Sequence, residues 1–85
     1  MEKNIDKKSR KLIQRKAELR KLGFTIARLR EERNITQSEL ATMLGYTNPA
    51  HVSRFESGNK APSMLILFEI ADILEVSIKD FFSEF

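Results

Sequence analysis

Apolar residues recur at helical spacing along most of the chain, and the clearest case is a short predicted helix over residues 37–44. Leu40 and the leucine one turn later lie on a single face of it. Thr36 is suited to the N-cap, and Glu39 follows three residues later, which together make a capping box. Gly45 accepts a left-handed backbone and is therefore expected to end this helix.

A second short helix is predicted to follow directly, so that the two form a pair joined by a tight turn. Asn48 is expected to cap it, and Pro49 suits its first helical position. Val52 and Phe55 are three residues apart and give the helix a buried edge. We expect the helix to end at Gly58.

Three further helices are expected around this pair, which makes the fold all-α. Residues 24–33 form the first, with Ile26 facing inward. Residues 64–74, capped by Ser63, form a helix that is apolar on most of its faces. Residues 78–82 form a last short helix.

The N-terminal segment, residues 1–22, differs from the rest in charge. It holds nine basic and three acidic residues, a net charge of +6, whereas the remaining residues have a net charge of −3. Ile5, Leu12 and Leu19 recur every seven residues and continue to Ile26, which gives a narrow apolar stripe on a basic helix. Charge concentrated at one end favours a polyanionic partner more than total charge does.

Three interpretations of residues 1–22 remain open at this point. The segment could be a solvated helix or frayed arm that packs loosely on the domain. It could be a helix that dimerises or caps the domain. It could also be a basic arm laid along DNA phosphates, which would add affinity and salt dependence without sequence information.

Composition argues against several other classes of protein. The chain has no cysteine and one histidine, so neither a disulfide, a metal site nor a bound cofactor is expected. The longest apolar run, residues 64–68, is too short to cross a bilayer, and residues 1–22 are too charged for a signal peptide, so we expect a cytoplasmic protein with no membrane partner. Glu31, Glu32 and His51 form no nucleophile–base set, and we expect no catalytic residue and no enzyme activity.

Three motifs occur in one order: Thr-Gln-x-x-Leu-Ala-x-x-Leu-Gly, Val-Ser-Arg-Phe-Glu-x-Gly and Pro-Ser. Together they resemble the helix-turn-helix of the Cro and phage-repressor (XRE-like) transcriptional regulators, over roughly residues 22–82. The resemblance implies a five-helix lambda-repressor-like DNA-binding domain at residues 23–85, with residues 1–22 as an added basic N-terminal helix or arm. The sequence departs from the family between Gly45 and Val52, where six residues stand in place of the usual five.

If the resemblance holds, the second helix of the pair, residues 48–57, enters the major groove of double-stranded DNA. Arg54 could then pair with guanine O6 and N7, and Asn48 could bind adenine if it does not act as a cap. Apolar side chains at this surface could contact a thymine methyl group, and part of the specificity would come from DNA shape. The expected base-contacting residues are Asn48, Pro49, Ala50, Ser53 and Arg54.

The resemblance also implies contacts to the DNA backbone and one structural ion pair. The glutamine that matches Gln37 holds a phosphate in the family, at a helix start where free N–H groups favour an anion. An arginine at the place of Arg30 pairs in the family with the glutamate that matches Glu56. The expected phosphate-contacting residues are Gln37, Thr47, His51, Ser57, Asn59 and Lys60.

Two functions follow from this reading. The first is a sequence-specific DNA-binding transcriptional regulator that binds a two-fold operator as a homodimer, and acts by occupying DNA or by touching polymerase. The surplus of apolar surface on residues 64–74 would supply the subunit interface, including Ile66, Ile73 and the terminal phenylalanines. The alternative is an antitoxin-type protein-binding module of the same fold, whose partner would be a toxin.

Overall fold

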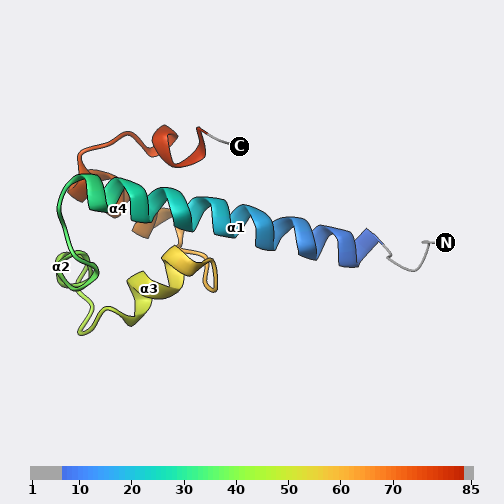
Figure 1. Ribbon diagram of the computed structural model, residues 1–85, viewed down its shortest axis with the longest axis horizontal. Coiled ribbons are helices and arrows are strands. Elements are labelled where there is room, and N and C mark those ends of the chain that lie inside the picture. Colours follow the sequence, from blue (N-terminus) through green and yellow to red (C-terminus); the bar gives the residue numbers. More distant parts are fainter. Residues whose placement is uncertain (1–6, 84–85) are drawn as a thin grey trace.

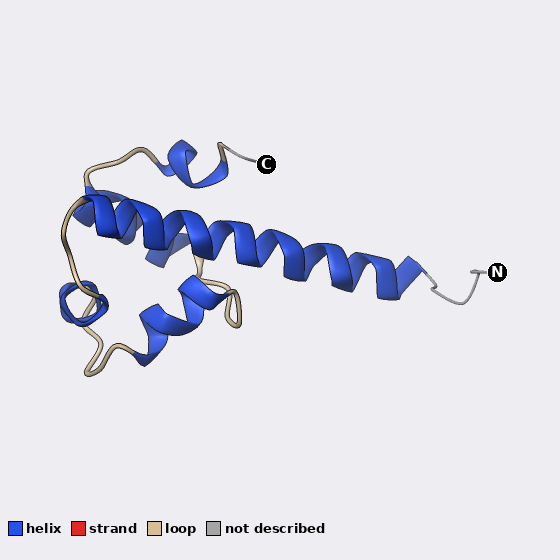
Figure 2. Cartoon of the chain, viewed as in Figure 1, coloured by secondary structure: helices blue, strands red, loops and turns tan. Residues whose placement is uncertain are grey.

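Four α-helices and one 3-10 helix make up the part of the chain that the computed structural model describes, residues 7–83. This stretch contains no strand, and the predicted all-α class is confirmed (Figures 1 and 2). The last predicted helix is present but has 3-10 geometry. In chain order the elements are α1 (Lys7–Glu32), α2 (Gln37–Met43), α3 (Ala50–Ser57), α4 (Met64–Leu74) and η2 (Ile78–Phe82).

Helix α1 is longer than either helix predicted for this part of the sequence. It runs without a break from Lys7 to Glu32, through the boundary predicted after residue 22, and Gly23 lies inside it. Residues 7–18 are all exposed, and this half of α1 projects away from the other helices (Figure 1). Ile5, the first residue of the predicted apolar stripe, lies outside the described residues.

The main core forms where the second half of α1 meets α4 and η2. Residues 23–26 are weak helix formers, so burial of one face stabilises α1 in this region. Phe81 of η2 is fully buried between these helices and closes the core. The buried residues of this cluster are Leu22, Ile26, Leu29, Leu67, Ile70, Ala71, Leu74 and Phe81.

The predicted helix pair is present, and its local signals act as expected. The hydroxyl of Thr36 accepts a hydrogen bond from the Glu39 amide, and the Glu39 carboxylate accepts one from the Thr36 amide. Gly45 has a φ of +88°, which a residue with a Cβ rarely adopts. Leu40 and Val52 form a second, smaller cluster that joins α2 to α3.

The start of α3 differs from the prediction by one residue. The helix begins at Ala50, so Pro49 occupies the N-cap position and not the first helical position. Asn48 is not the N-cap, although its side-chain oxygen accepts a hydrogen bond from the Ala50 amide at 2.9 Å. Because proline has no N–H, the first amide that Asn48 can reach is that of Ala50, so Asn48 still satisfies a free amide at the start of α3.

The residues expected at the subunit interface differ in exposure, and of the terminal phenylalanines Phe82 remains 38% exposed. Ile66 and Ile73 pack against the main core, and Phe81 is fully buried, so these side chains are used within the chain. Phe85 lies outside the described residues. The large apolar side chains that α4 leaves exposed are Met64, Leu65 and Phe68. Among the described residues, no helix is long and apolar enough to cross a membrane.

Candidate nucleic-acid interface

The side chains on the outward face of α3 are small and polar, except for one arginine. Val52 and Phe55 are buried against the rest of the molecule, so the opposite side of the helix faces solvent. Ser53, Arg54 and Ser57 are exposed on that side. The Arg54 guanidinium forms no ion pair with any residue from 7 to 83, and is therefore available to a ligand.

The turn before α3 supplies the remaining residues predicted to touch bases. Asn48 and Pro49 are exposed, and Ala50 is partly buried. Because the Asn48 oxygen is occupied by the Ala50 amide, its side-chain nitrogen is the polar atom best placed to contact a ligand. Thr47, predicted to contact a phosphate, is exposed beside them.

A buried polar network fixes α3 relative to α1 and α2. Arg30 donates two hydrogen bonds to the Glu56 carboxylate, from Nε at 2.6 Å and from a terminal nitrogen at 3.1 Å. The side chains are only 9% and 6% exposed. Gln37 donates a third hydrogen bond to Glu56 at 2.8 Å, so its side-chain nitrogen is already engaged and its oxygen remains for other contacts.

This network keeps Arg30 charged. The hydrogen bond to Glu56 raises the pKa of the guanidinium above the usual value for arginine, against the opposing effect of burial. A folded-state pKa above the unfolded one stabilises the protein at every lower pH. That contribution is lost only when the pH rises through the raised value, so it is fully present at neutral pH.

His51 and Lys60 are brought together beside α3. The His51 ring stacks on Tyr46, with 4.2 Å between ring centroids and 19° between planes. Lys60 Nζ lies 3.4 Å from His51 Nδ1. Two of the residues predicted to contact phosphates therefore share one edge of the α3 surface.

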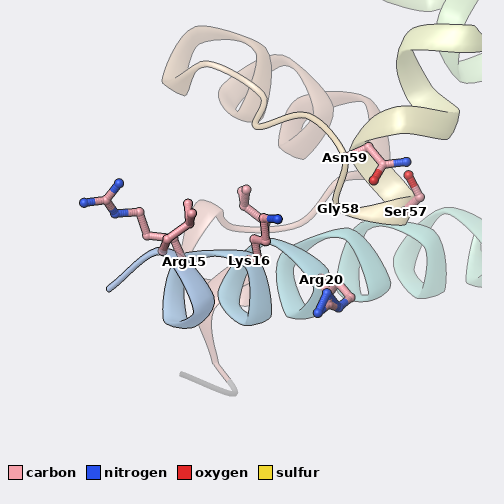
Figure 3. Close-up of a pocket in the computed structure, with 8 residues that line it drawn as sticks. Arg15, Lys16, Arg20, Ser57, Gly58 and Asn59 are labelled. Carbon is pink, nitrogen blue, oxygen red and sulfur yellow. The ribbon is translucent and has the colours of Figure 1, made fainter. Parts of the chain in front are cut away.

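Ser57 and Asn59 lie at the other end of α3, where they face α1. With Arg15, Lys16 and Arg20 of α1 they line a groove of about 510 Å³ (Figure 3). The sequence analysis predicted a phosphate role for the first two residues, but did not place three α1 cations next to them. The helical period of the sequence could not predict this groove, because the groove forms only where the C-terminal end of α3 packs against α1.

Comparison with known proteins agrees with this geometry. Residues 26–81 match the family model described as Helix-turn-helix, which is more than half of the chain. The chain belongs to the helix-turn-helix family. It is 38% identical over 61 residues to the uncharacterized HTH-type transcriptional regulator y4dJ of Sinorhizobium fredii, covering 71% of this chain and 78% of that protein. This confirms the resemblance to XRE-like transcriptional regulators, a family of DNA-binding proteins.

One further sequence relative and two solved structures are also similar to this chain. The uncharacterized HTH-type transcriptional regulator YqaE of Bacillus subtilis is 34% identical over 53 residues, which is 62% of this chain but only 45% of that longer protein. The restriction-modification controller protein C.AhdI of Aeromonas hydrophila superposes with a TM-score of 0.71 at 25% identity, covering 76% of this chain and 97% of that one. The clp gene regulator ClgR of C. glutamicum gives 0.70 at 26% identity, covering 76% and 83%.

The helix-turn-helix unit is held against α1 by a close contact at Gly23, which the sequence analysis took only as the start of the domain. A Cβ at this position would lie 2.5 Å from the carbonyl oxygen of Glu56 and nearer still to that of Phe55. No side chain fits there, so the backbones of α1 and α3 can approach each other directly. The signal in the sequence was a glycine inside an otherwise strong helical pattern.

Proposed function

We propose that this protein is a sequence-specific transcriptional regulator that places α3 in the major groove of operator DNA. It would act as a homodimer in the cytoplasm, where its operator DNA would lie, and it would catalyse no reaction. The observation that carries the proposal is the Arg54 guanidinium, which is exposed and unpaired on the outward face of a helix fixed by Arg30 and Glu56. A rigid helix with a free bidentate donor suits recognition of guanine.

The other base contacts follow from position on the same surface. Ser53 lies on the face of α3 with Arg54, and its small side chain allows close approach to the bases. Pro49 and Ala50 offer apolar contact to a thymine methyl group, and the Asn48 side-chain nitrogen offers a donor. With a single strong reader, part of the specificity comes from DNA shape.

The phosphate contacts surround this surface. Gln37 and Thr47 lie on its α2 side, His51 and Lys60 along one edge, and Ser57 and Asn59 at the end of α3. These contacts fix the register of the protein on the duplex.

The homodimer would use the exposed end of α4. Leu65 and Phe68 are 68% and 50% exposed, with Met64 beside them. A two-fold dimer would match the paired half-sites of an operator. We also propose that residues 1–22 form a functional segment distinct from the domain at 23–85, because residues 7–18 are all exposed. The controller protein and the gene regulator with similar structures support the regulatory role.

Selection of random-sequence DNA with the purified protein tests this proposal. We expect enrichment of a palindrome with half-sites about one helical turn apart. Arg54→Ala should weaken binding to the winning site by ~1–3 kcal/mol, about 5- to 150-fold, and relax the preference at one base pair. Arg28→Ala is the matched control, since that arginine is paired with Glu32 on α1 and should leave affinity unchanged. If no site is enriched, the regulator proposal fails, and co-purification of a partner chain would then favour the antitoxin-type module.

A further inference from the structure

We propose that the groove between the projecting half of α1 and the C-terminal end of α3 binds DNA backbone phosphates that flank the bases contacted by α3. This inference rests on the proposed function and adds a second contact region to it. The groove is defined by Arg15, Lys16 and Arg20 on one side and Ser57 and Asn59 on the other (Figure 3).

The groove is strongly basic. Arg15, Lys16 and Arg20 form no ion pair with any described residue, and none of the residues lining the groove is acidic. Over residues 7–22 the only acidic residue is Glu18, against eight basic residues, a net charge of +7. Such a concentration of positive charge favours a polyanion.

The groove is continuous with the surface proposed to contact bases. Ser57 lies one turn after Ser53, so the outward face of α3 leads directly into the groove. The Ser57 hydroxyl donates to the Arg54 carbonyl oxygen at 3.2 Å and therefore marks this junction without supplying a free donor. The donors toward a phosphate are the three α1 cations and the Asn59 amide.

The two sides of the groove are held together by a close backbone contact. A Cβ added to Gly58 would lie 3.0 Å from both the backbone nitrogen and the Cα of Arg20, so the end of α3 packs directly on the backbone of α1. Arg20 therefore stays in one place relative to the outward face of α3. The helical segment that carries the groove cations, residues 15–20, is about 9 Å long, which corresponds to about three base pairs along a duplex.

A second copy of this helix is a less suitable occupant. Leu12 and Leu19 form the apolar part of the groove and could in principle pack against another chain. Pairing two α1 segments would, however, bring a charge of +7 close to another of +7, and this repulsion opposes association. DNA phosphates are negatively charged, so their electrostatic interaction with this helix is attractive.

The test uses the site obtained by selection and compares two charge-matched variants. Arg15→Gln/Lys16→Gln/Arg20→Gln removes the groove cations. Lys7→Gln/Arg10→Gln/Lys11→Gln removes three charges from the same helix at positions that do not line the groove. If three phosphate contacts are lost, the slope of log K against log salt should decrease by about 2.7 in the groove variant and by less than about 1 in the control. The selected sequence should stay the same in both.

Two further readouts make the result decisive. About three base pairs of DNA added outside the selected site should strengthen binding of the wild type and the control but not of the groove variant, and phosphate ethylation in that flank should interfere with wild-type binding. Equal loss of slope in the two variants, or no loss in either, would overturn the inference. An altered oligomeric state of the groove variant in sedimentation, with an unchanged slope, would overturn it too and assign the groove to a second copy. A failed selection would instead reject the proposed function.

Discussion

Glu56 accepts three hydrogen bonds from two side chains, although it lies on the helix whose outer face is proposed to contact DNA. Two come from Arg30 on α1 and one from Gln37 on α2, so this one carboxylate joins three helices. Breaking a buried pair by removing one partner leaves an uncompensated charge, which costs more than the intact pair contributes. The arrangement therefore fixes angles between helices more than it adds net stability.

Arg30→Met should lower the free energy of unfolding by ~3–5 kcal/mol, because it leaves the Glu56 carboxylate buried with Gln37 as its remaining donor. Urea denaturation followed by circular dichroism measures this. The double variant Arg30→Met/Glu56→Leu is the control and should recover part of the loss, since no charge is then stranded. A single variant as stable as the wild type would show that the pair has no structural role.

Helices α1 and α3 meet through backbone atoms at Gly23, whereas at Gly45 a glycine is needed for a different reason. Space around Gly45 is open, with no heavy atom within 4 Å of an added Cβ, but its φ is +88°. Gly23 lies within a regular helix and has no space at all. A side chain is therefore excluded at Gly23 by close neighbouring atoms and disfavoured at Gly45 by backbone strain.

Gly23→Ala should destabilise the protein by about 1–3 kcal/mol through forced separation of α1 and α3, even though alanine favours an isolated helix by ~1 kcal/mol. The same change should weaken operator binding, because α3 must tilt. Gly45→Ala should cost ~1–2 kcal/mol from the left-handed backbone and should leave the affinity of the folded fraction unchanged. Urea titration and operator binding, measured on both variants, check this; a more stable Gly23→Ala protein would contradict the close contact.

Local signals in the sequence predicted local structure well. The capping box at Thr36 and Glu39 and the serine cap of α4 depend on neighbouring residues, and both are present. The continuity of α1 was missed because the family resemblance placed the start of the domain at residue 23, whereas packing against α3 allows a glycine inside the helix. The groove was missed for a similar reason: residues 15–20 and 57–59 meet only after α1 and α3 have packed. Glu75 also ends α4 with a φ of +58°, held by Arg33, which propensity alone does not predict.

The strongest concentration of positive charge and the exposed apolar side chains of α4 lie on different helices. The projecting end of α1 is strongly basic, while α4 presents exposed Leu65 and Phe68. Large apolar side chains that lie exposed next to each other often mark a protein–protein interface. DNA and a second subunit would thus use different parts of the chain.

Phe68→Lys should shift the protein toward a monomer in sedimentation velocity, because a charge would be buried in the proposed subunit interface. Binding to a palindrome should weaken, and binding to a single half-site should not. Phe24→Lys is the matched control, since Phe24 is 63% exposed on α1 and lies outside that interface. If both variants sediment like the wild type, α4 is not the dimer surface.

The unbroken course of α1 has a consequence for the thermodynamics of any contact made by residues 7–18. A flexible arm must be ordered when it binds, and fixing the backbone of each residue costs about 1–2 kcal/mol in conformational entropy. Here the helix is nucleated by its buried second half, so the projecting turns are extended from an existing template. The ordering cost therefore belongs to folding and not to association, and the helix meets its ligand as a preorganised rod.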